Sequence, residues 1–127
     1  MREALIIEDD FIVQESITII LEAHHFNVFQ APNGEVGIRL MEHNHFDVII
    51  TDIIMPVKEG LQTIKEAKQR WPYLKIIAIS SGGSEPQLDY LTAAKLLGVD
   101  ATLRKPIDAD DLMACIDKLI SKSPPDT

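Results

Sequence analysis

Three short runs of consecutive apolar residues constrain this chain more than any other feature of its sequence. They are Ala4–Ile7, Val48–Ile50 and Ile76–Ile79. Apolar residues in unbroken succession, rather than in alternation, are typical of strands that are covered on both faces, as in a parallel sheet. Two weaker runs, Val28–Phe29 and Ala101–Leu103, are candidates for two further strands.

Segments with apolar residues at helical spacing separate these runs. They extend over 12–21, 36–41, 61–71, 88–97 and 112–120. Five strands in strict alternation with five helices predict an α/β fold, because right-handed crossovers carry each helix over the sheet. We therefore expect a doubly wound (βα)5 domain, with a five-stranded parallel sheet in the order 2-1-3-4-5 and helices on both faces.

Composition limits the possible functions. The 127 residues suffice for one domain, which we expect over 1–121, with the proline-containing residues 122–127 as a flexible tail or the start of a linker. Twelve basic against 20 acidic residues give a net charge of −8. This charge disfavours direct binding to nucleic acid or to an anionic membrane. The single cysteine, Cys115, excludes an internal disulfide and is compatible with a cytoplasmic location.

Polar residues follow four of the five predicted strands directly. Glu8, Asp9 and Asp10 follow the first strand, and Asp52, Ser80 and Lys105 follow the third, fourth and fifth. In an open α/β sheet, ligands bind beyond the carboxyl ends of the strands. A lone acid in such a place is often only a helix N-cap, which is the role we expect for Asp10.

The expected convergence of Glu8, Asp9 and Asp52 requires a neutralising cation, because three adjacent carboxylates repel one another. Mg²⁺ suits such ligands and keeps open coordination positions, which phosphoryl oxygens can occupy. Lys105 and the Ser80 hydroxyl on the opposite side complete a pocket for a phosphoryl group. Carboxylates are known covalent acceptors of phosphoryl groups, and Asp52 is central here.

Taken together, these stretches resemble the receiver domain of bacterial two-component response regulators, over residues 2–121. The resemblance is carried by Ala4–Asp10, by Phe46–Pro56 with Gly60, by Ile79–Ser81 and by Lys105–Pro106. It implies a flavodoxin-like fold. It also implies phosphorylation of an aspartate by the phosphohistidine of a sensor histidine kinase or a histidine phosphotransfer protein.

The same resemblance implies a role for each residue of the predicted metal site. By position, Asp52 matches the phosphoacceptor. Asp9 matches the direct Mg²⁺ ligand, whereas Glu8 acts through water. The backbone carbonyl of Ile54 matches a further protein ligand.

Two other residues match the family's conformational machinery. Ser80 matches the switch hydroxyl and Lys105 the family's lysine, whose peptide bond to Pro106 is cis in relatives. Phosphorylation is expected to change the face formed by residues 84–120, which a downstream protein or an attached output domain then reads. Thr102 stands where many relatives carry an aromatic residue, so a switch based on that ring is not expected.

Two alternatives belong to other functional classes. A Mg²⁺-dependent phosphohydrolase with an aspartyl-phosphate intermediate usually carries a second aspartate two residues after the nucleophile, where this chain has Ile54. A flavodoxin-like cofactor-binding protein needs a phosphate-binding loop after the first strand, where Glu8–Asp10 would repel a phosphate. On the leading interpretation, the chain is no enzyme beyond catalysing its own phosphorylation and dephosphorylation.

Overall fold

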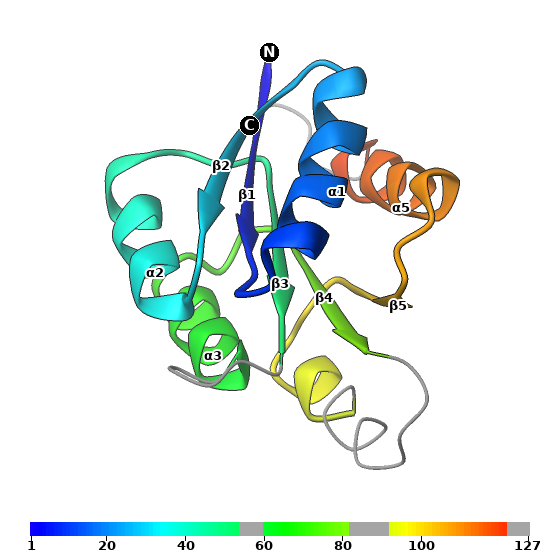
Figure 1. Ribbon diagram of the computed structural model, residues 1–127. Coiled ribbons are helices and arrows are strands. Elements are labelled where there is room, and N and C mark those ends of the chain that lie inside the picture. The colour runs from blue at the N-terminus through cyan, green and yellow to red at the C-terminus, as the bar shows by residue number, and fades with distance from the viewer. Residues whose placement is uncertain (54–59, 82–91, 122–127) are drawn as a thin grey trace.

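Five parallel strands form one sheet in the computed structural model of the chain, which describes residues 1–53, 60–81 and 92–121 (Figure 1). The order across the sheet is β2-β1-β3-β4-β5, as the sequence predicts. The strands are β1 (Arg2–Ile7), β2 (Phe26–Ala31), β3 (Val48–Asp52), β4 (Ile76–Ser81) and β5 (Ala101–Lys105).

Helices cover both faces of this sheet, with α1 and α5 on one side and α2 and α3 on the other (Figure 1). Their bounds are α1 (Phe11–Ala23), α2 (Gly34–His43), α3 (Gly60–Arg70) and α5 (Ala109–Ser121). Residues 92–96 are also helical, and the earlier part of the helix predicted over 88–97 lies outside the described residues. The predicted tail, 122–127, lies outside them too.

The two faces of the sheet bury two separate apolar cores. Along β1, Leu5 and Ile7 pack toward α2 and α3, whereas Ala4 and Ile6 pack toward α1 and α5. Because both faces are covered, neighbouring strand residues are buried alike, which explains the unbroken apolar runs. Each large side chain buried in this way stabilises the fold by about 1.5–3 kcal/mol.

Local signals in the sequence set several helix ends. The Asp10 carboxylate accepts hydrogen bonds from the amides of Ile12 and Val13, and Asn33 caps α2 in the same manner. Gly98 has a φ of 97°, a left-handed conformation that glycine adopts readily after a helix. The cap at Asp10 agrees with the sequence-based expectation. Within the described ranges, no helix combines the length and apolarity needed to cross a lipid bilayer.

Candidate functional site

Three carboxylates meet at the carboxyl edge of the sheet. Glu8 and Asp9 follow β1, and Asp52 ends the neighbouring strand β3, in which Thr51 pairs with Ile7 of β1. One carboxylate oxygen from each acid lies within 4.8 Å of the other two. Glu8 and Asp52 are buried, at 1% and 4% exposure, whereas Asp9 is exposed. Glu8, Asp9 and Asp52, which the sequence predicts to converge at the strand ends, therefore lie together in the structure.

Lys105, the last residue of β5, reaches across the end of β4 to the buried acids. Its Nζ lies 2.9 Å from Glu8 Oε1 and donates a hydrogen bond of 3.3 Å to Asp52 Oδ2. Burial would lower the pKa of Lys105, but the hydrogen bond to Glu8 and the charge of Asp52 outweigh it, so the pKa is raised. The lysine is therefore held as a cation. The Lys105–Pro106 peptide bond is cis, as the resemblance implies.

Glu8 is the electrostatically strained member of the cluster. Burial raises its pKa from 4.5 to about 7, and the charge of Asp52 acts in the same direction. The Lys105 ammonium and the Asp10 amide, which donates to Glu8 Oε2 at 3.0 Å, only partly oppose this rise. In the metal-free chain, burial therefore favours the protonated form of Glu8, and the neighbouring charge of Asp52 adds to this effect.

Ser80 lies near the end of β4, one residue beyond the position that pairs with Asp52. Its side chain is fully buried, and its Oγ has no hydrogen-bond partner among the described residues. A buried hydroxyl without a partner costs about 1–3 kcal/mol, which is the kind of cost tolerated at functional sites. Such a hydroxyl is available to a ligand oxygen.

The donor set fits a hard divalent cation. Three carboxylate oxygens within 4.8 Å of one another are the ligands that Mg²⁺ prefers, and an added positive charge would relieve the repulsion between Glu8 and Asp52. The predicted carbonyl ligand, Ile54, lies outside the described residues.

Two residues contact the site although the sequence analysis assigns them no role there. Gln14 is buried in α1 and its side chain donates to the backbone carbonyl of Glu8. Gly60 begins α3 so close to β3 that a Cβ there would overlap the Asp52 carbonyl oxygen. A polar residue on the apolar face of the 12–21 helix is the signal that identifies Gln14. Gly60 appears in the family motif, but its close approach to the Asp52 backbone can be recognised only in the tertiary structure.

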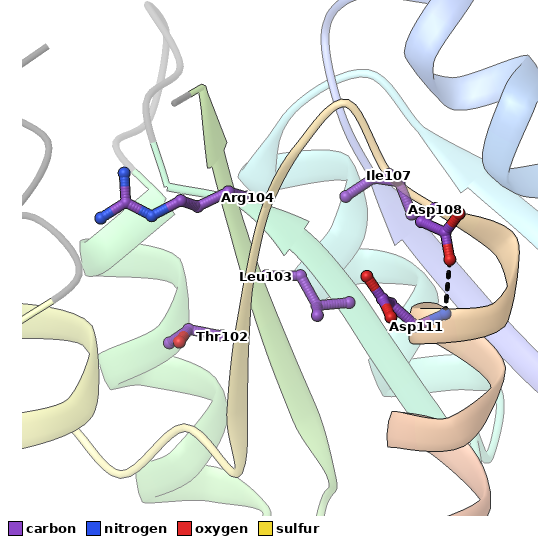
Figure 2. Close-up of a pocket in the computed structure, with 6 residues that line it drawn as sticks. All are labelled: Thr102, Leu103, Arg104, Ile107, Asp108 and Asp111. Carbon is purple, nitrogen blue, oxygen red and sulfur yellow. Dashed lines mark hydrogen bonds between the residues drawn. The ribbon is translucent and has the colours of Figure 1, made fainter. Parts of the chain in front are cut away.

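Two hollows lie apart from the acidic cluster. A cavity of about 260 Å³ lies beside β5 and the start of α5. Figure 2 shows residues that line it, among them Asp108, which accepts a hydrogen bond from the Asp111 amide. Thr102 lies on its β5 wall. A groove of about 920 Å³ includes Trp71 and Tyr73, near the amino ends of the strands. Neither hollow is lined by the three acids.

Comparisons with known proteins all point to the same family. The sequence pattern that defines the response regulator receiver domain matches residues 4–117. The transcriptional regulatory protein CpxR of Klebsiella pneumoniae is 31% identical over 97% of this chain, and the cell cycle response regulator CtrA of Brucella ovis is 32% identical over 94%. The chain spans only 51% and 50% of the lengths of those two relatives.

Solved structures agree with the sequence match. A response regulator receiver domain protein from Clostridium thermocellum superposes with a TM-score of 0.88 at 30% identity, covering 96% of both chains. A CheY-like receiver domain protein from Methanospirillum hungatei gives a TM-score of 0.89 at 26% identity, covering 97% of this chain and 96% of that one. The fold, the acidic strand ends and these matches lead to one conclusion: the chain belongs to the response regulator receiver domain family.

Proposed function

We propose that this domain accepts a phosphoryl group on Asp52 from a phosphohistidine and relays the signal by a change of conformation. The observation that carries the proposal is the convergence on the Asp52 carboxylate. Lys105 contacts it at 3.3 Å, and Glu8 and Asp9 lie beside it. A metal site, a cation and a carboxylate nucleophile are together what phosphoryl transfer to an aspartate requires.

Each residue has a part in the proposed reaction. Asp9 and Asp52 would hold Mg²⁺ directly, Glu8 would hold it through water, and the Ile54 carbonyl would complete the protein ligands. When bound, the ion neutralises charge on the phosphoryl oxygens. An Asp52 oxygen attacks phosphorus, the bond from phosphorus to the donor imidazole nitrogen breaks, and its electron pair stays on that nitrogen. The Lys105 ammonium stabilises the negative charge of the transferred group.

The signal leaves the site through Ser80. Aspartyl phosphate adds a charge of about −1.5 to −2 and strong acceptor oxygens, to which the buried Ser80 hydroxyl can donate. That bond draws the segment after β4 inward and alters the face formed by residues 84–120. This is a population shift between two conformations, because the phosphoryl group binds one of them better.

The partners follow from this chemistry. The phosphoryl donor is a sensor histidine kinase or a histidine phosphotransfer protein, and the receiver of the signal is a downstream protein or an attached output domain. Residues 1–121 form the phosphoacceptor domain. The chain turns over no separate substrate, and its only catalysis is its own phosphorylation and dephosphorylation.

Acetyl phosphate with Mg²⁺ tests the proposal. We expect intact mass spectrometry to detect one phosphoryl group per chain, and the Asp52→Asn variant to remain unmodified. Asp108→Asn is the matched control, because it removes one acid at a helix cap while asparagine preserves the cap. Continuous release of phosphate with no stable adduct would instead indicate a phosphohydrolase. Absence of any reaction would contradict both phosphoryl-transfer functions.

The lifetime of the phosphorylated form is a separate expectation. Ile54 and Gly82, at the two positions that flank the phosphoryl group in relatives, cannot orient an attacking water, so self-dephosphorylation should be slow. Both residues lie outside the described part of the chain. Decay of the isolated phosphorylated protein within seconds, followed by mass spectrometry after removal of the donor, would contradict this expectation.

A further inference from the structure

Gln14 is a buried carboxamide on the sheet-facing side of α1, where the other buried residues are Ile17, Thr18 and Leu21. It lies in the first half of the helix and is 8% exposed. A polar side chain in such a place is retained only where its hydrogen bonds are satisfied. Its contacts therefore identify what it does.

Both contacts of the carboxamide are at the ends of strands. Nε2 donates to the backbone carbonyl of Glu8 at 3.1 Å and to that of Ala31 at 3.4 Å. The paired register of β1 and β2 ends with Ile7 and Ala31, and the Glu8 amide also donates to the Ala31 carbonyl at 3.0 Å. Gln14 thus donates to a backbone acceptor just beyond the last paired position of the sheet.

The Glu8 carbonyl belongs to the peptide group that joins Glu8 to Asp9. A hydrogen bond to it restricts the orientation of that peptide, and hence the direction in which both acidic side chains leave the backbone. On the other side of the same turn, the Asp10 amide holds Glu8 Oε2 at 3.0 Å. The turn that carries the two acids is therefore fixed both through its backbone and through a side chain.

We propose that Gln14 is a positioning residue for the divalent-cation site, acting through the Glu8–Asp9 peptide. This inference rests on the proposed function. Gln14 does not touch the ion or the phosphoryl group. It places the two acids before the ion arrives, so that less ordering accompanies binding. Groups that orient metal ligands in this indirect way typically change metal affinity by about 10–100-fold when removed.

The test compares Gln14→Met with Thr18→Val. Methionine has nearly the same shape as glutamine but no donor. Thr18 is the matched control, because it lies one turn later on the same helix and is also 8% exposed. Its hydroxyl forms hydrogen bonds with the Gln14 carbonyl and the Gln30 side chain, neither of which is an acid of the site. Titration calorimetry with MgCl₂ should show about tenfold weaker binding for Gln14→Met. Thr18→Val should bind within about twofold of the wild type.

Two further readouts separate positioning from a general loss of structure. In the metal-free chain, the Asp10 amide should exchange with deuterium faster in Gln14→Met than in Thr18→Val. With acetyl phosphate, the Mg²⁺ concentration for half-maximal phosphorylation should rise about tenfold, while the rate at saturating Mg²⁺ stays within about twofold. Loss of a merely structural residue would not raise the Mg²⁺ requirement while leaving the rate at saturating Mg²⁺ unchanged.

The outcomes separate a failure of the positioning role of Gln14 from a failure of the proposed function. If the wild type binds Mg²⁺ and is phosphorylated, but Gln14→Met binds Mg²⁺ as tightly as Thr18→Val, the positioning role is wrong and the proposed function stands. If the wild type neither binds Mg²⁺ nor is phosphorylated, the proposed function itself fails. If Gln14→Met does not fold, Gln14→Asn takes its place, since its shorter carboxamide should not reach both carbonyls, and unchanged Mg²⁺ affinity in it would equally overturn the role.

Discussion

Burial of Glu8 makes the metal-free chain less stable as the pH rises, because burial outweighs the ion pair with Lys105 and raises the pKa of this acid. Its pKa is about 7 in the folded chain, against an ordinary value of 4.5. The folded state therefore holds this proton more tightly than the unfolded state does. The resulting stability is fully present below pH 4.5 and is lost as the pH rises to about 7.

The magnitude follows from the two pKa values. A tenfold change in a proton-binding constant corresponds to about 1.4 kcal/mol, so the difference between 4.5 and about 7 sets an upper limit of about 3.5 kcal/mol. Part of this change falls below pH 5, because the ordinary pKa of the acid is 4.5. We therefore expect the metal-free wild type to lose about 2 kcal/mol through Glu8 between pH 5 and pH 8.

Urea unfolding in the presence of a chelator, at a series of pH values, measures this loss. Glu8→Gln retains the size of the side chain and has no proton to lose, so its stability relative to the wild type should rise by about 2 kcal/mol from pH 5 to pH 8. Glu35→Gln, at an exposed site in α2, is the control and should follow the wild type. A constant difference between Glu8→Gln and wild type at every pH would refute the reasoning.

Three further predictions concern the same edge of the sheet and the core beneath it. Gly60→Ala should lose about 1–3 kcal/mol in urea unfolding, because its Cβ overlaps the backbone of Asp52 and Ile53; an unchanged midpoint would contradict the close approach. Ile50→Ala should lose about 2–5 kcal/mol, because Ile50 is fully buried in a central strand; a smaller loss would mean that the core collapses around the gap. At pH 8, Mg²⁺ at a hundred times its dissociation constant should stabilise the wild type by about 2.7 kcal/mol. The same Mg²⁺ concentration should stabilise Asp9→Ala far less, as measured by thermal unfolding. Equal stabilisation of the two proteins would show that Asp9 is not a metal ligand.

Much of the fold could be predicted because the strands of a covered parallel sheet have a strong sequence signature. The central strands β1, β3 and β4 appear as unbroken apolar runs. The edge strands are less distinct: β2 extends from Phe26 to Ala31, but between these two buried ends its residues are half-buried or exposed, so only Val28–Phe29 stands out. An edge strand has one neighbour and buries less surface, which weakens its hydrophobic pattern.

The acids and the lysine of the site could be predicted because the carboxyl ends of parallel strands share one edge. Strand order alone brings Asp52 beside Glu8 and Asp9. It does not reveal that the Lys105 ammonium contacts Glu8 more closely than Asp52, since that depends on the path of one long side chain across β4. Nor does it reveal the contact from Gln14, which requires the packing of α1 on the sheet.

Locating the transferred phosphoryl group tests the central claim most directly. After reaction with acetyl phosphate and Mg²⁺, borohydride reduction converts an aspartyl phosphate to homoserine, which tandem mass spectrometry assigns to one position. The account predicts homoserine at position 52 alone, and none when Mg²⁺ is removed by a chelator. Modification at another carboxylate, with Asp52 intact, would contradict it.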